Sequence, residues 1–460
     1  MPKKYHIEVR PVPNRYPQIG RSGIVDWGEG CLKCPSCVKH ECVYNVYRQR
    51  TFSAEIMADT IDELCKDCFR CVQGCPKRLI HKALNPEWET LGDDVYTPEI
   101  VAANWEQAKT GKIPVSGAGY GGAFVGKGFD SMWTDMSEIV RPTRDGIHGR
   151  EYISTVVDLG RRPANLQFDD NGKLTTQPPP MVRLPIPVLL DIPAFGDMSS
   201  QVWRAIALAA SELGTLAIVP QAQIEQLTDL KSSLVPLLDG DGWDKKWIRQ
   251  FRMVEVPDGS DAVEQFDRIK GIDGSIVVSV RVPATVAAVS RAWELSEHGV
   301  DIVHFVADER GYEPGVPDAK HLKDVMRAQH GALVERGVRD EITLMASGGI
   351  AMAEHVVKAM LCGANVVGMD LPLLLALECR LCRNCREGGE CPVKLSTIDP
   401  KWGAQRIVNL VGAWHNQCLE MMGAMGIREA RRLRGEQGRV MFFEDLENDT
   451  FARLFRGREG

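Results

Sequence analysis

The stretch from Thr343 to Val393 decides the fold prediction; it reads TLMASGGIAMAEHVVKAMLCGANVVGMDLPLLLALECRLCRNCREGGECPV. The apolar run Ile342 to Met345 has the length of a buried strand, and Ser347-Gly348-Gly349 ends it. Apolar residues then recur at helical spacing, which predicts a strand, a glycine turn and a helix. Free N–H groups at such a helix start, with no Cβ on the two glycines, suit a phosphate oxygen.

A second short strand follows at Asn365 to Met369, before the cysteine-rich end of the same stretch. In (β/α)8 barrels the loops after the seventh and eighth strands commonly hold a ligand phosphate, and two strands this late in the chain fit those places. The pattern therefore predicts phosphate contacts from Ser347, Gly348 and Gly349. An ordinary βα turn is the alternative for the glycines taken alone.

The composition excludes several classes of protein. A chain of 460 residues with 44% hydrophobic content has room for about two or three domains, one of them of barrel size. The net charge of −7 and the lack of a long Lys/Arg run argue against nucleic-acid binding. The basic start has no apolar signal core, and no run of about 18 apolar residues occurs, so we expect a cytoplasmic protein without membrane insertion.

Twelve of the fourteen cysteines fall into three tight groups. In a large chain without a secretory signal this predicts metal ligands, because the cytosol keeps thiols reduced. Each group contains C-x2-C-x2-C and a fourth cysteine, which suits an iron–sulfur cubane, whereas a zinc site needs no third cysteine in such a run. The predicted ligands are Cys31, Cys34, Cys37 and Cys42; Cys65, Cys68, Cys71 and Cys75; and Cys379, Cys382, Cys385 and Cys391.

A ferredoxin-type cross-over would give each of the first two clusters its fourth ligand from the other group. On that hypothesis Cys75 completes the first group and Cys42 completes the second. The third group has four thiolates of its own, enough for one [4Fe–4S] cluster. The cysteines thus predict three four-iron clusters.

From Pro185 onward, short apolar runs alternate with helical segments, which is typical of an α/β protein. We expect a (β/α)8 TIM barrel, although only seven of its eight strands can be placed; the missing one is expected in Ser232 to Leu238 or just before Arg252. A Rossmann sheet is the competing fold, but no G-x-G-x-x-G follows the first strand. The seven predicted strands are Val188 to Ile192, Leu216 to Val219, Arg252 to Val256, Ser275 to Val280, Ile302 to Val306, Ile342 to Met345 and Asn365 to Met369.

Several segments resemble the FMN-binding domain of glutamate synthase and occur in the order that the family has them. The resemblance covers about residues 185 to 430, behind a ferredoxin-like front as in archaeal-type glutamate synthases. The matching segments are IPAFGDMS from Ile192, similar to the family's M-S-F-G-A-L-S turn; Ser279 to Val282, similar to S-V-K-L; the phosphate turn Ala346 to Ile350; the cysteine segment Leu377 to Val393; and the helical tail Val408 to Ile427.

Two loops depart from the family pattern. Where the family has G-H-D-G-G-T-G-A, this chain has Ala307 to Gly315, and Val219 to Ile224 replaces N-T-G-E-G-G. These loops shape the substrate end of the barrel, so the resemblance leaves the substrate open. The start of the chain shows neither a catalytic N-terminal cysteine nor a glutaminase-sized domain, so we expect no release of ammonia from glutamine.

The resemblance implies three parts: a ferredoxin-like domain with two [4Fe–4S] clusters over residues 1–110, a connecting segment over 111–184 packed on the barrel, and an FMN-binding barrel with the third cluster and a helical tail over 185–460. The family's own third cluster commonly has three irons, a [3Fe–4S] cluster, against the four predicted here. Cofactor contacts are implied for Ala194, Phe195, Gly196, Gln221, Arg281, Ser347, Gly348, Gly349, Gly368 and Met369.

Two side chains are predicted to act in catalysis. Arg281 takes the position of a family lysine beside the flavin ring, where its charge would stabilise the reduced ring. A strand-end salt bridge is the alternative. His304 lies in a predicted strand and would act as an acid or base near the substrate, with a hydrogen-bonded core histidine as the alternative.

The resemblance predicts an FMN and iron–sulfur oxidoreductase that passes electrons through its clusters to FMN. It would reduce an imine, such as that formed from 2-oxoglutarate and ammonia or an amine. The alternative is an electron-transfer subunit of a larger flavin and iron–sulfur complex that acts on another acceptor. The expected partners are a small-molecule substrate and other redox subunits, a ferredoxin or an NAD(P)H-oxidising flavoprotein, within a multi-subunit complex.

Overall fold

The structure is a computed structural model that describes residues 5–25, 30–32, 34, 36–49, 60–113, 126–135, 153–240 and 242–455. Two stretches of the predicted connecting segment, 114–125 and 136–152, therefore lie outside the described residues. Within the described part, none of the helices has the length and apolar character needed to cross a bilayer.

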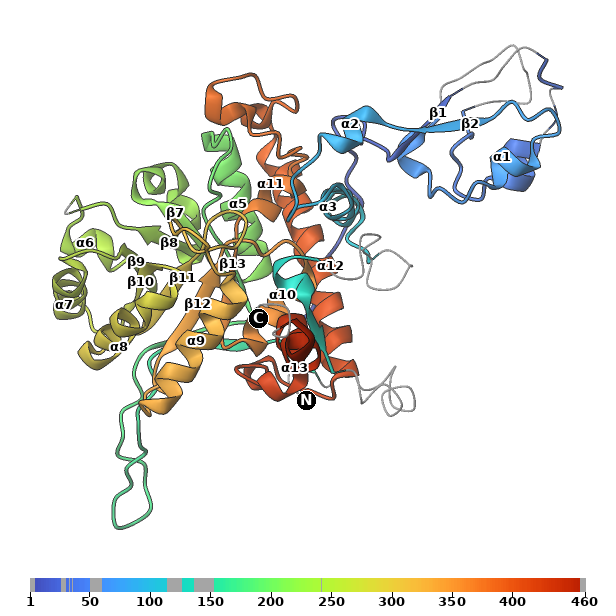
Figure 1. Cartoon of the computed structure of the whole chain (residues 1–460). Helices are drawn as coiled ribbons and strands as arrows, with labels where there is room; N and C mark the ends of the chain where they lie inside the picture. Colours follow the sequence, from blue (N-terminus) through green and yellow to red (C-terminus); the bar gives the residue numbers. More distant parts are fainter. Residues whose placement is uncertain are drawn as a thin grey trace.

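Eight parallel strands close into a barrel, which confirms the predicted (β/α)8 fold (Figure 1). Each of the seven predicted strands is present, and the last barrel strand closes the ring by pairing with the first. Because almost every residue of these strands is buried, the barrel interior is a packed core. In chain order the strands are β6 (Val188–Leu190), β7 (Ala217–Pro220), β8 (Leu234–Leu237), β9 (Met253–Pro257), β10 (Val277–Pro283), β11 (Ile302–Val306), β12 (Thr343–Ser347) and β13 (Val366–Met369).

The strand that the sequence pattern did not place is β8, inside the first of the two expected windows. Its four residues, LVPL, contain Pro236, which lacks a backbone N–H and lowers the strand signal. The connection before it is the 3₁₀ segment η6 (Gln221–Ser233) and not an amphipathic α-helix. The usual switch between strand and helix periodicity is therefore missing on both sides of β8.

Helices surround the barrel, and the long helix α12 (Pro400–Ala424) packs against four others: α5, α10, α11 and α3. The first of these, α5, starts at a Ser199 side chain that accepts a hydrogen bond from the N–H of Val202, and it ends at Gly214 with φ +67°. The helices around the barrel are α5 (Ser200–Leu213), α6 (Lys245–Ile248), α7 (Ala262–Ile272), α8 (Val289–His298), α9 (Leu322–Glu335), α10 (Ala353–Leu361) and α11 (Leu371–Ala376).

The first eight clustered cysteines lie in a small module that extends away from the barrel (Figure 1). It contains the antiparallel strands β1 (Ser22–Val25) and β2 (His81–Leu84), the helix α1 (Arg70–Gly74), the π-helical turn η1 (Ser36–Glu41) and the 3₁₀ turn η2 (Asp62–Leu64). Its own core is built from Cys37, Val46, Tyr47, Cys71 and Ile80. A ferredoxin-like fold for this module stays a prediction.

After the module, α2 (Pro86–Glu89) and α3 (Pro98–Thr110) lead back to the barrel, where α3 packs on α11 and α12. The strands β4 (Val157–Gly160) and β5 (Met181–Leu184) form a hairpin whose connecting loop projects from the body (Figure 1). The base of this hairpin lies at the amino end of the barrel, because Thr343 at the start of β12 donates its hydroxyl to the carbonyl of Gly160 at 2.8 Å. Near the C-terminus, β14 (Val440–Phe442) pairs with β3 (Met132–Thr134) and leads into α13 (Phe443–Phe455).

Candidate active site and cysteine centres

The carboxyl end of the barrel gathers the ten predicted cofactor residues. Because all eight strands run parallel, the residues that end or follow them meet at one rim. Their burial varies: Ala194 is exposed, Gly368 and Met369 are buried, and the side-chain oxygen of Gln221 accepts a hydrogen bond from the N–H of Asp239 at 3.1 Å. The rim is therefore built from segments far apart in the sequence.

The turn after β12 is a buried set of backbone donors. Gly348 and Gly349 have φ values of +97° and +69°, and a Cβ on them would lie 2.6 Å from the carbonyl oxygen of Asp308 and 2.5 Å from the Cα of Gly311, respectively. Gly348, Gly349 and Ile350 are buried residues, and their N–H groups donate to no other residue in the described part of the chain. Buried N–H groups without acceptors suit an anionic oxygen, so the turn fits a phosphate monoester such as that of FMN.

A network of charged side chains fills the barrel interior below this turn. The Arg281 guanidinium donates to Asp191 at 2.8 Å and to Glu255 at 2.9 Å. Nδ1 of His304 lies 2.8 Å from a Glu255 carboxylate oxygen, and its Nε2 lies 2.6 Å from the Ser347 hydroxyl. Both structural alternatives, the arginine salt bridge and the hydrogen-bonded core histidine, are present, and catalytic roles for Arg281 and His304 stay predictions.

Only Arg281 in this network reaches solvent. Its side chain is 18% exposed, whereas those of Asp191, Glu255 and His304 are at most 1% exposed. Burial raises the pKa of Asp191 and Glu255, but the charges of Arg281 and His304 outweigh it and hold both pKa values below the usual range. Two ionised carboxylates therefore hold the guanidinium in place, while part of the Arg281 side chain stays accessible.

Asp370, directly after β13, is a site residue that the sequence did not single out. It is 5% exposed, and its Oδ1 has no hydrogen-bond partner among the described residues. Burial, assisted by the negative charge of Asp191, raises its pKa to about 7. Its position just after the eighth barrel strand is the one signal that points to it, because that loop faces the rim.

Asp370→Asn should change how stability depends on pH. The folded pKa of about 7 lies above the ordinary 3.8, so the wild type loses stability as pH rises from about 4 to 7 and keeps that loss above 7. The loss is at most about 4 kcal/mol, at 1.36 kcal/mol per pKa unit. Urea unfolding between pH 5 and 8 should show the loss in the wild type but not in Asp370→Asn. Parallel pH profiles for the two proteins would contradict this assignment.

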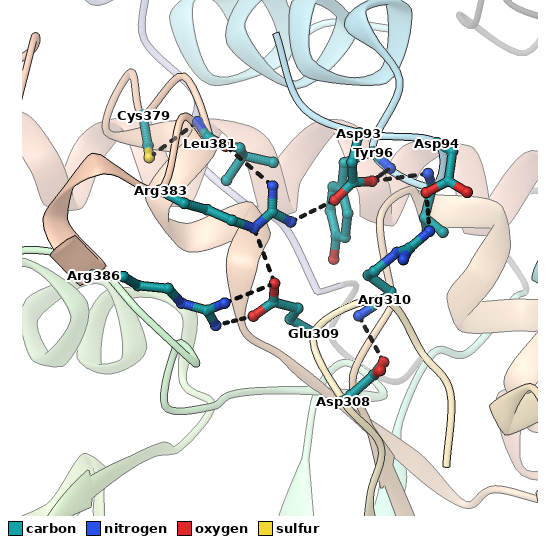
Figure 2. Close-up of polar contacts among 11 residues, drawn as sticks. Asp93, Asp94, Tyr96, Asp308, Glu309, Arg310, Cys379, Leu381, Arg383 and Arg386 are labelled. Carbon is teal, nitrogen blue, oxygen red and sulfur yellow. Dashed lines mark hydrogen bonds and ion pairs between the residues drawn. The ribbon is translucent and has the colours of Figure 1, made fainter. Parts of the chain in front are cut away.

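The loop Ala307–Gly315, one of the two that depart from the family pattern, is tied to the third cysteine group (Figure 2). Glu309 accepts a hydrogen bond from Arg383 at 3.0 Å and also pairs with Arg386. The same Arg383 pairs with Asp93, at 2.5 Å, in the segment before α3. Three parts of the chain thus meet above the barrel rim through one connected set of ion pairs.

Phe195 lies beneath these arginines at the rim. Its ring centroid is 5.4 Å from the Arg383 guanidinium carbon and 4.8 Å from that of Arg386, within cation–π range. In the same loop as Glu309, Arg310 pairs with Asp94 (Figure 2). The predicted cofactor residue Phe195 therefore also anchors the cysteine segment.

The three cysteine groups share an uncommon backbone. In the second and third groups, the residue before the second cysteine and the residue after it are both left-handed, although none of the four is glycine. In all three groups, the third residue after the last cysteine is also left-handed. Such residues cost about 1–3 kcal/mol each and persist where the surroundings require them. The residues and φ values are Asp67 (52°), Phe69 (58°), Leu381 (53°) and Arg383 (60°), then Asn45 (59°), Arg78 (53°) and Lys394 (43°).

A pocket in the module brings the first group together with one cysteine of the second. Its lining includes Cys31, Cys34, Cys37 and Cys75. These are the four thiols that the cross-over hypothesis assigns to one cluster. All fourteen cysteines are free thiols, so the donor set suits a metal cluster.

Lys82 contacts a predicted ligand of the second group. Its ammonium donates to the Cys65 sulfur at 2.7 Å and to Asp67 at 3.0 Å, and its side chain is only 3% exposed. Hydrogen bonds and charge at the ligand sulfurs are among the factors that set a cluster's potential. Lys82 therefore places a positive charge against a predicted ligand of the second group.

Comparisons with known proteins agree with the resemblance. The conserved region in glutamate synthase matches residues 315–428. The archaeal-type glutamate synthase [NADPH] of Dehalococcoides mccartyi is 26% identical and covers 88% of this chain and 92% of its own length. The archaeal glutamate synthase [NADPH] of Methanocaldococcus jannaschii is also 26% identical, over 96% of this chain and 95% of its own.

Two solved structures are similar at low identity. A flavocytochrome b2 variant with sulfite bound has a TM-score of 0.40 and 12% identity, over 67% of this chain and 80% of its own. A mandelate oxidase variant with a monooxide FMN adduct has a TM-score of 0.39 and 14% identity, over 63% and 89%. The sequence matches span the cysteine groups and the barrel. Together with the matching family region, they support placing the chain in the glutamate synthase family.

Proposed function

We propose that this oxidoreductase holds FMN at the carboxyl end of its barrel and three [4Fe–4S] clusters at its cysteine groups, and that it reduces an imine to an amine. The single observation that carries the proposal is the buried set of free N–H groups at Gly348, Gly349 and Ile350, directly above the Arg281 network. The relatives named archaeal-type glutamate synthase [NADPH] support imine reduction as the reaction class.

Bound FMN would supply two-electron hydride chemistry while exchanging single electrons with iron–sulfur clusters. The three N–H groups would hold its phosphate, and the accessible part of the Arg281 side chain would face its ring. Reduction of an imine also consumes a proton at nitrogen. Asp370, with a pKa of about 7 and a free carboxyl oxygen, is the group at this rim suited to provide it.

The shared backbone of the cysteine groups supports one type of cluster in all three. In the third group, as in the second, the residues directly before and after the second cysteine are left-handed. We therefore assign four irons to the third group as well. The pocket that joins Cys75 to the first group supports the cross-over between the first two groups. These clusters would supply one-electron transfer to and from redox partners.

A second candidate function is an electron-transfer subunit that acts on another acceptor. The loop Ala307–Gly315 favours it, because Glu309 and Arg310 hold that loop to the cysteine segment and to Asp94. A loop fixed in this way leaves less of the rim free for a substrate. Redox subunits, a ferredoxin or an NAD(P)H-oxidising flavoprotein would then be its partners.

Anaerobic purification followed by iron, flavin and reoxidation analysis tests the proposal. We expect about twelve irons per chain, as three four-iron clusters require, and one FMN. The reduced protein should be reoxidised by 2-oxoglutarate with ammonia or methylamine. With iron and FMN present, failure of both amines to reoxidise it would reject imine reduction and leave the second candidate, whereas zinc in place of iron would reject both.

Gly349→Ala should weaken FMN binding at least tenfold. The added Cβ would meet the Cα of Gly311 at 2.5 Å, which forces the donor turn away from its loop. Gly337→Ala is the matched control, because Gly337 has a similar φ of +73° but no atom within 4 Å of the added Cβ. Both variants carry the same backbone strain, so only Gly349→Ala should lose FMN in a fluorescence titration. Equal affinities would place the phosphate elsewhere.

A further inference from the structure

A small pocket lies at the amino end of the barrel, opposite the rim described above. Its lining includes Arg162, Arg431, Arg434, Asp158 and Asn365. Asn365 directly precedes β13, and the N–H of Arg162 donates to the carbonyl of Glu341, which precedes β12. Because ligands of such barrels bind at the carboxyl end, this pocket is separate from the proposed FMN site.

The arginines of this pocket are only partly neutralised. Arg431 donates to Asp158 at 2.7 Å, and Arg434 pairs with Asp340. Arg162 is half-buried, and its guanidinium has no hydrogen bond or ion pair with any residue that the structure describes. One of the three lining arginines is therefore left without a counter-ion.

A fourth arginine behind the pocket adds a second uncompensated charge. Arg339 is 3% exposed and donates only to neutral acceptors, namely a ring nitrogen of His330, the carbonyls of Ile342 and Gly363, and the side-chain oxygen of Asn365. Among the described residues, four guanidinium groups thus face two carboxylates. A charge buried as deeply as that of Arg339 is normally paired, because desolvation without a partner is costly.

The guanidinium groups around this pocket repel one another. Burial, and then the neighbouring Arg434, lowers the pKa of Arg339 to about 9. Burial and the nearby Arg434 and Arg431 also lower the pKa of Arg162. An anion bound in the pocket would offset this repulsion between the arginines.

We propose that the pocket binds a phosphate-type dianion between the guanidinium groups of Arg162, Arg431 and Arg434. Two uncompensated positive charges match a dianion, and guanidinium forks suit the oxygens of a phosphate group. The shared chemistry fits either inorganic phosphate or the phosphate end of a small ester. The site is independent of FMN and of the imine reaction.

The test uses the full chain and its thermal unfolding. Inorganic phosphate should raise the Tm of the wild type in a saturable manner, and titration calorimetry should give a matching Kd. Arg162→Gln should raise that Kd at least tenfold. In phosphate-free buffer the same variant should have a Tm no lower than the wild type, because the substitution removes the repulsion. Arg432→Gln is the matched control, because Arg432 is exposed on the same turn as Arg431 and does not line the pocket.

Glycerol phosphate shows whether the pocket is suited to a phosphate ester or to the free anion. A lower Kd for glycerol phosphate than for inorganic phosphate would indicate an ester. An equal or higher Kd would indicate the free anion. Sodium chloride at matched ionic strength tests for an adventitious ion only: an equal rise in Tm with chloride would overturn the proposal. So would an unchanged Kd in Arg162→Gln. If Arg162→Gln does not fold, Arg434→Gln gives the same comparison, with the same tenfold loss expected and an unchanged Kd overturning the site.

Discussion

Asp191→Ala should lower the free energy of unfolding by about 3–5 kcal/mol, the usual cost of breaking a buried ion pair from one side. Asp191 accepts from Arg281 at 2.8 Å and lies 3.7 Å from His304 inside the barrel, with its side chain 1% exposed. Its removal leaves Glu255 as the one carboxylate facing these two groups in the described network. Urea unfolding at pH 7 measures the effect.

Two further variants show whether the loss comes from the charge network. Asp197→Ala removes an exposed carboxylate from the same loop and should change stability by less than about 0.5 kcal/mol. Adding Arg281→Met to Asp191→Ala should recover part of the loss, because the uncompensated guanidinium is then gone. Losses that simply add in the double variant would show that Asp191 stabilises the barrel independently of Arg281.

Cys75→Ser should remove the cluster of the first cysteine group and reduce the iron content from about twelve to about eight per chain. Cys75 lines the pocket that also contains Cys31, Cys34 and Cys37, although it lies 38 or more positions after them in the sequence. On the cross-over, Cys31→Ser removes the same cluster, so the double variant Cys31→Ser/Cys75→Ser should lose no more iron than either single variant.

A double variant with one substitution in each predicted cluster completes this test. Cys31→Ser/Cys68→Ser disables both clusters of the module and should leave about four irons. Cys418→Ser, at a buried thiol outside the three groups, should keep all of them. If Cys31→Ser/Cys75→Ser also fell to about four irons, each group would hold its own cluster, and the cross-over would be wrong.

The strands of the barrel could be predicted because each is a short, continuous apolar run between turn signals. The strand β8 was not predicted, because Pro236 and a 3₁₀ connection remove those local signals; pairing with its neighbours β7 and β9 holds it in place. Asp370 was not predicted for a different reason. Its raised pKa comes from burial and from Asp191, which is 179 residues earlier in the chain.

The sequence by itself determined the barrel, the grouping of the cysteines and the glycine turn, because each of these is visible as a spacing along the chain. Tertiary structure alone decided which charges meet. It placed Asp191, Glu255 and His304 around Arg281, tied Glu309 to the arginines of the third cysteine group, and gathered four arginines around two carboxylates at the opposite end. Electrostatic energies depend on the distance between charges and on their burial, and neither can be read from residue order.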